Sequence, residues 1–123
     1  MAGTLVANTI NTDTGLFSTQ NAYQGIAKAW VNLNASGVVQ QSFNISSVTI
    51  NAAGDYTLNF ATAFANSNYV VSGTSSDTPT YGRIVCISEL PAPTSSAVRV
   101  VSFNRSAGAL AAGNYMSFVI FGN

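Results

Sequence analysis

Acid–base chemistry in this sequence would depend on its four carboxylates, which are Asp13, Asp55, Asp77 and Glu89. Histidine is absent. Without histidine, the usual general base, the Ser-His-Asp triad and the commonest metal ligand are missing. Glycoside hydrolysis would need two carboxyl groups held about 5–10 Å apart. All four carboxylates fall in segments predicted to be turns or loops. We therefore expect them to be turn residues, and we expect no enzymatic activity.

Cys86 is the only cysteine of the chain. One thiol without any histidine cannot make an ordinary zinc site, and neither a phosphate-binding loop nor a dinucleotide fingerprint occurs. The sequence therefore predicts no metal and no cofactor. Because Ile84, Val85 and Ile87 around it are apolar, the thiol is predicted to be buried and structural rather than reactive.

Charge is scarce, since only 7% of the residues are charged and the formal net charge is zero. The cations Lys28, Arg83, Arg99 and Arg105 are scattered, whereas nucleic-acid binding needs clustered Lys and Arg, so no nucleic-acid partner is expected. No apolar run approaches the roughly 20 residues of a membrane span, and the N-terminus lacks the pattern of a signal peptide. We expect no membrane insertion. With so few charged residues, the surface of the protein is either coated by uncharged polar groups or buried against other subunits.

Alternation of apolar and polar residues with a period of two dominates the chain and predicts strands. About eight or nine short strands separated by turn signals favour an all-β fold, specifically an antiparallel β-sandwich. We expect a sandwich domain over residues 25–123 and an N-terminal arm over residues 1–24. The predicted segments are a strand at Thr4–Ile10, a turn at Asn11–Gly15, an irregular link at Leu16–Gly25, a loop at Ala61–Asn68 anchored by Phe64, and strands that begin near Ala27, Val39, Tyr56, Tyr69, Tyr81, Ala97 and Tyr115.

The strand that begins near Val39 changes its pattern. Val39, Gln41, Phe43 and Ile45 alternate along it, and the phase then shifts at Ser46-Ser47, where a bulge or a corner is expected. After the shift, Val48 and Ile50 are predicted to point inward.

Two predicted strands carry more apolar surface than one buried face explains. Trp30 lies on the strand face opposite Ala29 and Val31. The C-terminal strand is apolar on both faces, since its two alternating sets are Tyr115, Val119, Phe121 and Met116, Phe118, Ile120. Such faces are buried against a second sheet or a neighbouring subunit, so the candidates for a subunit interface are Trp30, Tyr115, Phe118 and Phe121. Alternatively, the indole of Trp30 is exposed as a stacking platform for a sugar ring.

Three segments resemble a known family in order and spacing. They are Ala27–Asn32 (AKAWVN), Ser42–Thr49 (SFNISSVT) and Gly54–Phe60 (GDYTLNF). Together they resemble the terminal domain that recurs in tail-fibre and other appendage proteins of tailed bacteriophages. The resemblance covers about the middle third of the chain and fades toward the C-terminus.

The resemblance implies a structural protein of a phage virion, made in the cytoplasm of the host bacterium. Knobs of this kind are commonly trimeric, so a jelly-roll-like homotrimer is expected. The arm is expected to anchor the knob to capsid or tail proteins through Thr4, Leu5, Val6 and Ile10. Because the domain starts near residue 25, no room is left for a fibre shaft, which favours capsid decoration or cement.

The alternative is a tail-fibre tip that binds host-surface glycans. In that case, the expected contacts lie in four loops: Asn34–Gly37, Asn66–Asn68, Ser75–Thr80 and Arg105–Gly113.

Overall fold

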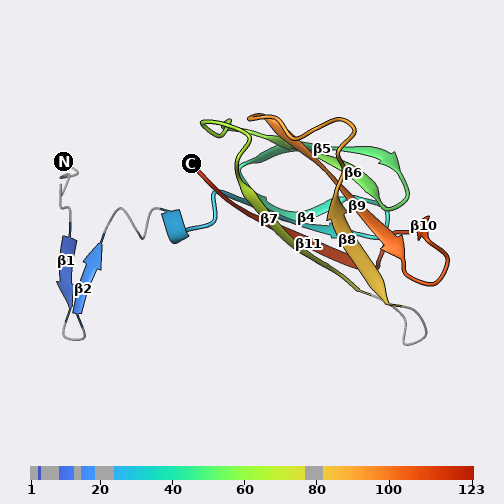
Figure 1. Ribbon diagram of the computed structural model, residues 1–123, viewed down its shortest axis with the longest axis horizontal. Coiled ribbons are helices and arrows are strands. Elements are labelled where there is room, and N and C mark those ends of the chain that lie inside the picture. The colour runs from blue at the N-terminus through green and yellow to red at the C-terminus, as the bar shows by residue number, and fades with distance from the viewer. Residues whose placement is uncertain (1–2, 4–8, 13–14, 19–23, 77–81) are drawn as a thin grey trace.

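The computed structural model describes residue 3 and residues 9–12, 15–18, 24–76 and 82–123, and it consists mainly of strands (Figure 1). The predicted all-β fold is confirmed, because β3 to β11 form two antiparallel sheets. The strands are β1 (Thr9–Thr12), β2 (Gly15–Ser18), β3 (Ala29–Asn34), β4 (Val39–Phe43), β5 (Ile45–Ala52), β6 (Asp55–Phe60), β7 (Val70–Ser75), β8 (Arg83–Ile87), β9 (Ala97–Asn104), β10 (Ala109–Leu110) and β11 (Tyr115–Phe121).

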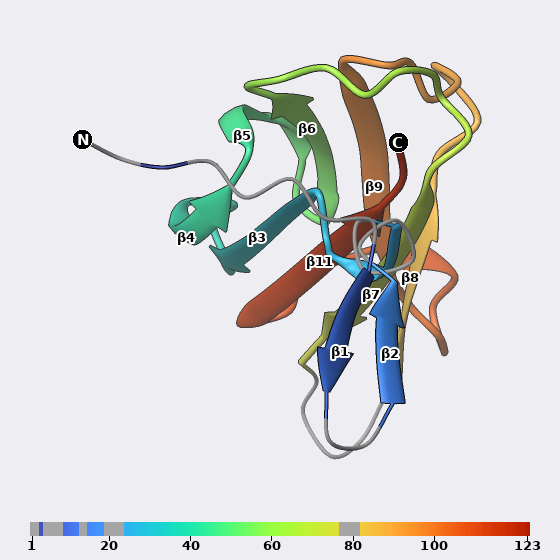
Figure 2. The same ribbon diagram turned by 90° about the vertical axis from the view of Figure 1, so that its left-hand side faces the viewer.

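The two sheets lie face to face as layers (Figures 1 and 2). Sheet I has the strand order β4-β3-β11-β7. Sheet II has the order β10-β9-β6-β5, with β8 also paired to β9. Because Val100 and Val101 pair with both β6 and β8, those two strands lie on opposite edges of β9. Sheet II therefore ends at β8 on one side and at β5 on the other.

The core lies between the sheets and is built from every second residue of the central strands. Ala29, Val31 and Leu33 are buried on β3, which confirms the alternation predicted for this segment. Apolar side chains that alternate along a strand reach one face of a sheet, so two such faces pack against each other. The other core side chains are Tyr56, Leu58, Phe60, Phe64, Tyr69, Val98, Val100, Met116, Phe118 and Ile120.

Phe64 is buried and anchors the loop between β6 and β7, as predicted. Its ring lies 4.7 Å from that of Phe60 and 4.9 Å from that of Tyr69, measured between centroids. The Tyr69 hydroxyl donates to the carbonyl oxygens of Thr94 (2.9 Å) or Ala97 (3.0 Å). Burial raises the pKa of Tyr69 to about 12. The cluster therefore closes one end of the core and ties the β8–β9 loop to it.

Two predictions on the N-terminal segment are wrong in their boundaries. β1 extends to Thr12, into the predicted turn Asn11–Gly15, and β2 occupies part of the predicted irregular link. The register Ile10↔Phe17 shows that these strands form a hairpin of their own. A period-two pattern over four residues is too short to separate such a strand from a link.

Cys86 was predicted to be buried, and this is wrong, because the thiol is exposed. β8 is an edge strand, and Cys86 lies on the outer side of sheet II, alternating with Val85, which packs against the core. The error at Cys86 arises because an apolar run does not tell which strand will lie at a sheet edge. Ile50 lies opposite the buried Tyr56 and so projects to the inner face of the sheet, as predicted, but it is 53% exposed because β5 is an edge strand.

Asp55 is not a turn residue but the first residue of β6, and it is only 2% exposed. The Nε of Arg99 donates to its Oδ1 at 2.8 Å, and a second guanidinium nitrogen pairs with Oδ2. Arg99 also donates to the carbonyl of Leu90, so one side chain joins β6, β9 and the loop between β8 and β9. The hydrogen bond from Arg99, reinforced by Asn51, holds the pKa of Asp55 below its usual range despite burial of the carboxyl group.

We predict that Asp55→Asn lowers the unfolding free energy at pH 7 by about 1–3 kcal/mol, because a buried charged hydrogen bond is lost. In the wild type, the contribution is present above the unfolded-state pKa of about 3.9 and is lost as the pH falls through the lower folded-state pKa. The difference between the two proteins therefore shrinks as the pH falls. Urea unfolding from pH 7 to about pH 2 measures this. As a control, Glu89→Gln makes the same carboxyl-to-amide change at an exposed position outside the ion pair. A pH-independent difference for Asp55→Asn would contradict the assignment.

Candidate functional site

The outer face of sheet I carries an apolar band across all four strands. Trp30 on β3 lies opposite Phe43 on β4 and Val119 on β11, and Phe121 lies opposite Val70 on β7. Residues directly opposite each other in an antiparallel ladder project to the same face. We call these five residues the apolar stripe. The residues at the two ends of the stripe are exposed to solvent, Phe43 to 54% and Val70 to 66%.

A row of uncharged polar side chains runs beside the stripe. Asn32 lies opposite Gln41 and Ser117, and Ser117 lies opposite Thr74. Together with Trp30, this row lines a groove of about 310 Å³. The Oδ1 of Asn32 is buried and has no hydrogen-bond partner among the described residues. An acceptor in that state costs roughly 1–3 kcal/mol, so a donor that entered the groove would gain a prepared partner.

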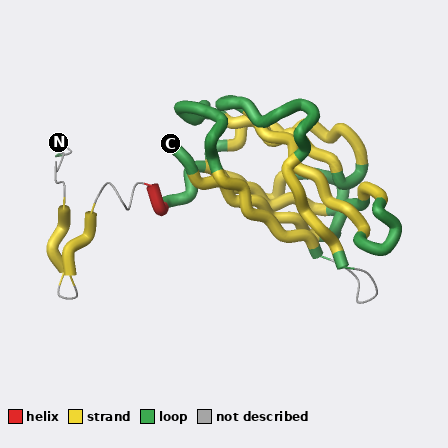
Figure 3. The backbone as a smooth tube through the Cα atoms, viewed as in Figure 1, coloured by secondary structure: helices red, strands yellow, loops and turns green. Residues whose placement is uncertain are grey.

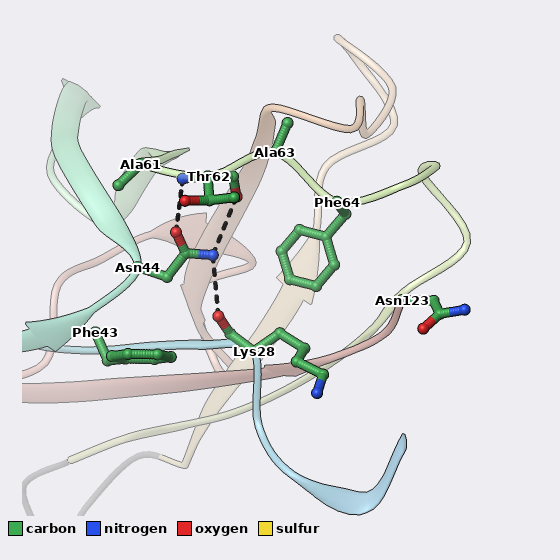
Figure 4. Close-up of a pocket in the computed structure, with 8 residues that line it drawn as sticks. All are labelled: Lys28, Phe43, Asn44, Ala61, Thr62, Ala63, Phe64 and Asn123. Atoms are coloured by element: carbon green, nitrogen blue, oxygen red, sulfur yellow. Dashed lines mark hydrogen bonds between the residues drawn. The ribbon is translucent and has the colours of Figure 1, made fainter. Parts of the chain in front are cut away.

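A second hollow, of about 490 Å³, opens on the other side of Phe43 (Figure 4). Figure 4 shows Phe43 and Lys28 in the lower part of the view and Phe64 above them to the right. Asn44 lies at its wall, and the remaining lining residues are Ala61, Thr62, Ala63 and Asn123. The exposed ring of Phe43 is thus shared by the stripe and this hollow.

Asn44 sits where the chain leaves β4 in sheet I and enters β5 in sheet II. Its φ of 54° lies in the left-handed region, which asparagine tolerates better than most residues. Its Nδ2 donates to the carbonyls of Lys28 (3.0 Å) and Thr62 (3.1 Å), and its Oδ1 accepts from the Thr62 amide (2.7 Å) (Figure 4). The predicted irregularity is present, since the register shifts between Ile45 and Ser47, but the corner itself is at Asn44.

The structure separates the predicted interface residues. Trp30 lies on the outer face as predicted and is half-buried, and Phe121 belongs to the stripe. Tyr115 is exposed, but it lies at the opposite end of β11. Phe118 is wrong as an interface candidate: it faces sheet II in the core and is 4% exposed. Of the predicted anchoring residues, Ile10 lies in β1, and three lie outside the described residues: Thr4, Leu5 and Val6.

Phe43, Val70 and Val119 complete the stripe and were not among the candidates. The missed signal is Asn44. When it is taken as a break, Phe43 falls on the same sheet face as Trp30, whereas uninterrupted alternation groups Phe43 with Ile45.

The loops proposed as glycan contacts do not form one surface. Asn34–Gly37, Ser75-Ser76 and Arg105–Gly113 lie at one end of the body, since Tyr115 pairs with Asn34 and its carbonyl accepts from Ser76. Asn66–Asn68 precedes β7 at the other end, where Val70 pairs with Phe121. The rest of the predicted loop Ser75–Thr80 lies outside the described residues.

The arm enters at the end of the body where the stripe lies. The amide of Lys28, just before β3, donates to the Ile120 carbonyl at 2.8 Å, which places the start of the domain beside the end of β11. Figures 1 and 3 show the β1-β2 hairpin beyond this end, apart from the two sheets. Among the described strands, β1 and β2 pair only with each other. An isolated two-stranded hairpin is marginally stable in water, so this one gains from further contacts.

Two further findings concern the described residues alone. They contain no group of three or more His, Cys, Asp or Glu side chains that could hold a metal ion. They also contain no helix long and apolar enough to cross a membrane.

Comparisons of the chain with protein-family models, with curated proteins and with solved structures found no match.

We predict that Asn44→Ala lowers the unfolding free energy by about 2–4 kcal/mol. The substitution removes the side-chain hydrogen bonds of the corner. It also places alanine at a positive φ, which alanine tolerates less well than asparagine. Asn44→Gly relieves the backbone term but not the hydrogen bonds, so its loss should be smaller. Denaturant unfolding of the three proteins gives the comparison. If Asn44→Ala unfolds at the same denaturant concentration as the wild type, Asn44 does not hold the corner.

Proposed function

We propose that this chain is a structural protein of a bacteriophage virion, a jelly-roll-like knob that assembles as a homotrimer and is attached by residues 1–24. We favour decoration of the capsid as its role. The observation that carries the proposal is the position of the apolar stripe at the end of the body where the arm enters. An exposed apolar surface beside a tethering segment suits a knob that packs at one end and projects the other.

Burial of the stripe between copies is the basis for the trimer. Contiguous exposed apolar surface marks interaction sites in soluble proteins, and aromatic residues such as Trp30 and Phe43 are enriched at the centres of interfaces. The chain has a net charge of zero, so its copies approach without overall repulsion.

Attachment through the arm accounts for its separate hairpin. A strand of the arm can add to an exposed sheet edge of a neighbouring particle protein and gain backbone hydrogen bonds without any charge. Each arm alone binds weakly. Three arms on one trimer reinforce each other through effective concentration, so the knob acts as a clamp on the shell.

We predict that deletion of residues 1–24 leaves a folded, trimeric knob that no longer joins particles. Circular dichroism and light scattering test the knob, and incorporation into particles tests the arm. Full incorporation of the truncated protein would overturn the anchoring role. The copy number per particle separates the locations, since numbers on the order of hundreds fit a coated shell with its many equivalent sites and far fewer fit a fibre tip.

A second candidate, recognition of a host-surface glycan, is favoured by the groove beside Trp30. An indole is a flat apolar surface for a sugar ring, and the buried Oδ1 of Asn32 would accept from a hydroxyl. Gln41, Ser117 and Thr74 add further uncharged polar groups of the kind that fix the orientation of a ligand.

The substitution Trp30→Ala distinguishes the two roles. For the trimer, we expect at least about a ten-fold weaker association by sedimentation, because the centre of the stripe is lost. Tyr115→Ala, on the same face but distant from the stripe, is the matched control and should stay trimeric. If Trp30→Ala remains trimeric while reproducible binding on a glycan array disappears, the groove is a ligand site and the second candidate replaces the first.

A further inference from the structure

β8 forms an apolar and accessible edge of sheet II. It pairs with β9 and with no other described strand. Ile84 is 48% and Ile87 is 39% exposed, and Cys86 between them is exposed. The one charge on this strand is on Arg83, its first residue.

The backbone of β8 has groups directed away from its one partner. The Gly82 carbonyl accepts from the Arg105 amide, and the Ser88 amide donates to the Arg99 carbonyl. The even-numbered residues of β8 are therefore the ones whose backbone groups bond to β9. In an antiparallel ladder this direction alternates. The amide and carbonyl groups of Val85 and Ile87 therefore face the open edge, and they have no hydrogen-bond partner among the described residues.

Natural proteins protect such edges with prolines, charges or bulges. In the described part of the chain, β5 has register shifts at Ile45/Ser47 and Ile50/Ala52, and β4 is paired across a shift at Asn32/Leu33. β7 reads VVSGTS, which is largely polar. β8 reads RIVCI, contains no proline and pairs without any shift. It is the least protected of these edges.

We infer that β8 pairs with β8 of a second copy in an antiparallel arrangement about a two-fold axis at Val85. In this register, each Val85 exchanges backbone hydrogen bonds with its counterpart, and each Ile84 lies opposite Cys86 of the other copy. Sheet II then continues from one chain into the next. This inference goes beyond the proposed function, since it concerns a different surface from the stripe.

A second copy fits this edge better than a partner of another chemistry. Antiparallel pairing of identical strands is self-complementary, so every outward donor meets an acceptor. Arg83 of each copy lies at opposite ends of the paired strands, so the two cations do not face each other. Ile84 and Cys86 place apolar atoms against each other across the axis, a pairing that contributes to sheet stability.

The substitution Ile84→Cys tests the register directly. The thiol introduced at position 84 of one copy would lie opposite Cys86 of the other in a pair not joined by backbone hydrogen bonds, where Cα atoms are about 4.5 Å apart, within the range for a disulfide. Under mild oxidation, we expect most of the protein to run as a covalent dimer on a non-reducing gel. In the wild type, the two Cys86 residues are offset by two positions, roughly 8 Å apart, too far for a disulfide. We therefore expect no dimer for the wild type or for Ile84→Cys combined with Cys86→Ser.

Equally strong cross-linking in Ile84→Cys and in Ile84→Cys combined with Cys86→Ser would overturn the register. If folded Ile84→Cys forms no cross-linked dimer, the pairing itself is overturned. Val85→Pro gives a second measurement, because proline removes an outward amide without touching a bond to β9. With the fold checked by circular dichroism, we expect association through β8 to weaken at least about ten-fold in sedimentation. The Ile84→Cys dimer should persist in a Trp30→Ala background, which separates failure of this contact from failure of the stripe.

Discussion

The fold depends on one constraint: a single run of chain, from Val39 to Ala52, belongs to both sheets. The break at Asn44 lets β4 pair with β3 in sheet I while β5 pairs with β6 in sheet II. Its amide group ties this corner to the chain before β3 and to the loop after β6. The two sheets are therefore joined along one side by covalent chain and by hydrogen bonds. On the opposite side, β7 and β8 end their sheets, no ladder joins them, and residues 76–82 separate them in the sequence, whereas Asn44 alone separates β4 from β5. An apolar hollow of about 250 Å³, lined by Val71 and Val85 among others, lies there.

This asymmetry determines which surfaces remain for other molecules. At the closed side, the corner turns Phe43 outward beside Trp30, and the stripe starts there. At the open side, β8 keeps its outer backbone groups unpaired. Neither surface carries a charge of its own apart from Arg83, so association at either depends on apolar contact and backbone hydrogen bonds. Such contacts are not weakened by ionic screening, in contrast to those of a charged surface.

Alternation predicted β3, β6 and β9 well because each buries one face against the other sheet, whereas β11 is apolar on both faces and its buried face was not predicted. The same rule failed at Asp55 because the partner that buries it, Arg99, is 44 residues away, and at Cys86 because edge position is a property of topology. Phe118 and Trp30 are both large aromatic residues of sheet I, yet Phe118 is in the core and Trp30 is on the stripe. The reason is that their side chains project to opposite faces of the sheet. The segments Ala27–Asn32, Ser42–Thr49 and Gly54–Phe60 each contain a residue with a tertiary role: Trp30 on the stripe, Asn44 at the corner and Asp55 in the ion pair. The sequence does not reveal which contact each of these residues makes.

The stripe and the β8 edge differ in direction, and that difference limits the assemblies they can build. The stripe is on the outer face of sheet I, whereas β8 adds strands within the plane of sheet II, so occupation of one leaves the other accessible. A chain that closed a three-fold ring through its stripe and paired two-fold through β8 would have two unlike symmetric contacts. Combined contacts of different symmetry produce either larger closed particles or continuous layers rather than a small isolated oligomer. A layer is the geometry that coating a shell requires, whereas a single trimer at a fibre tip has no use for a lateral two-fold contact. The occupancy of the β8 edge therefore bears on the location of the protein as well as on its oligomeric state.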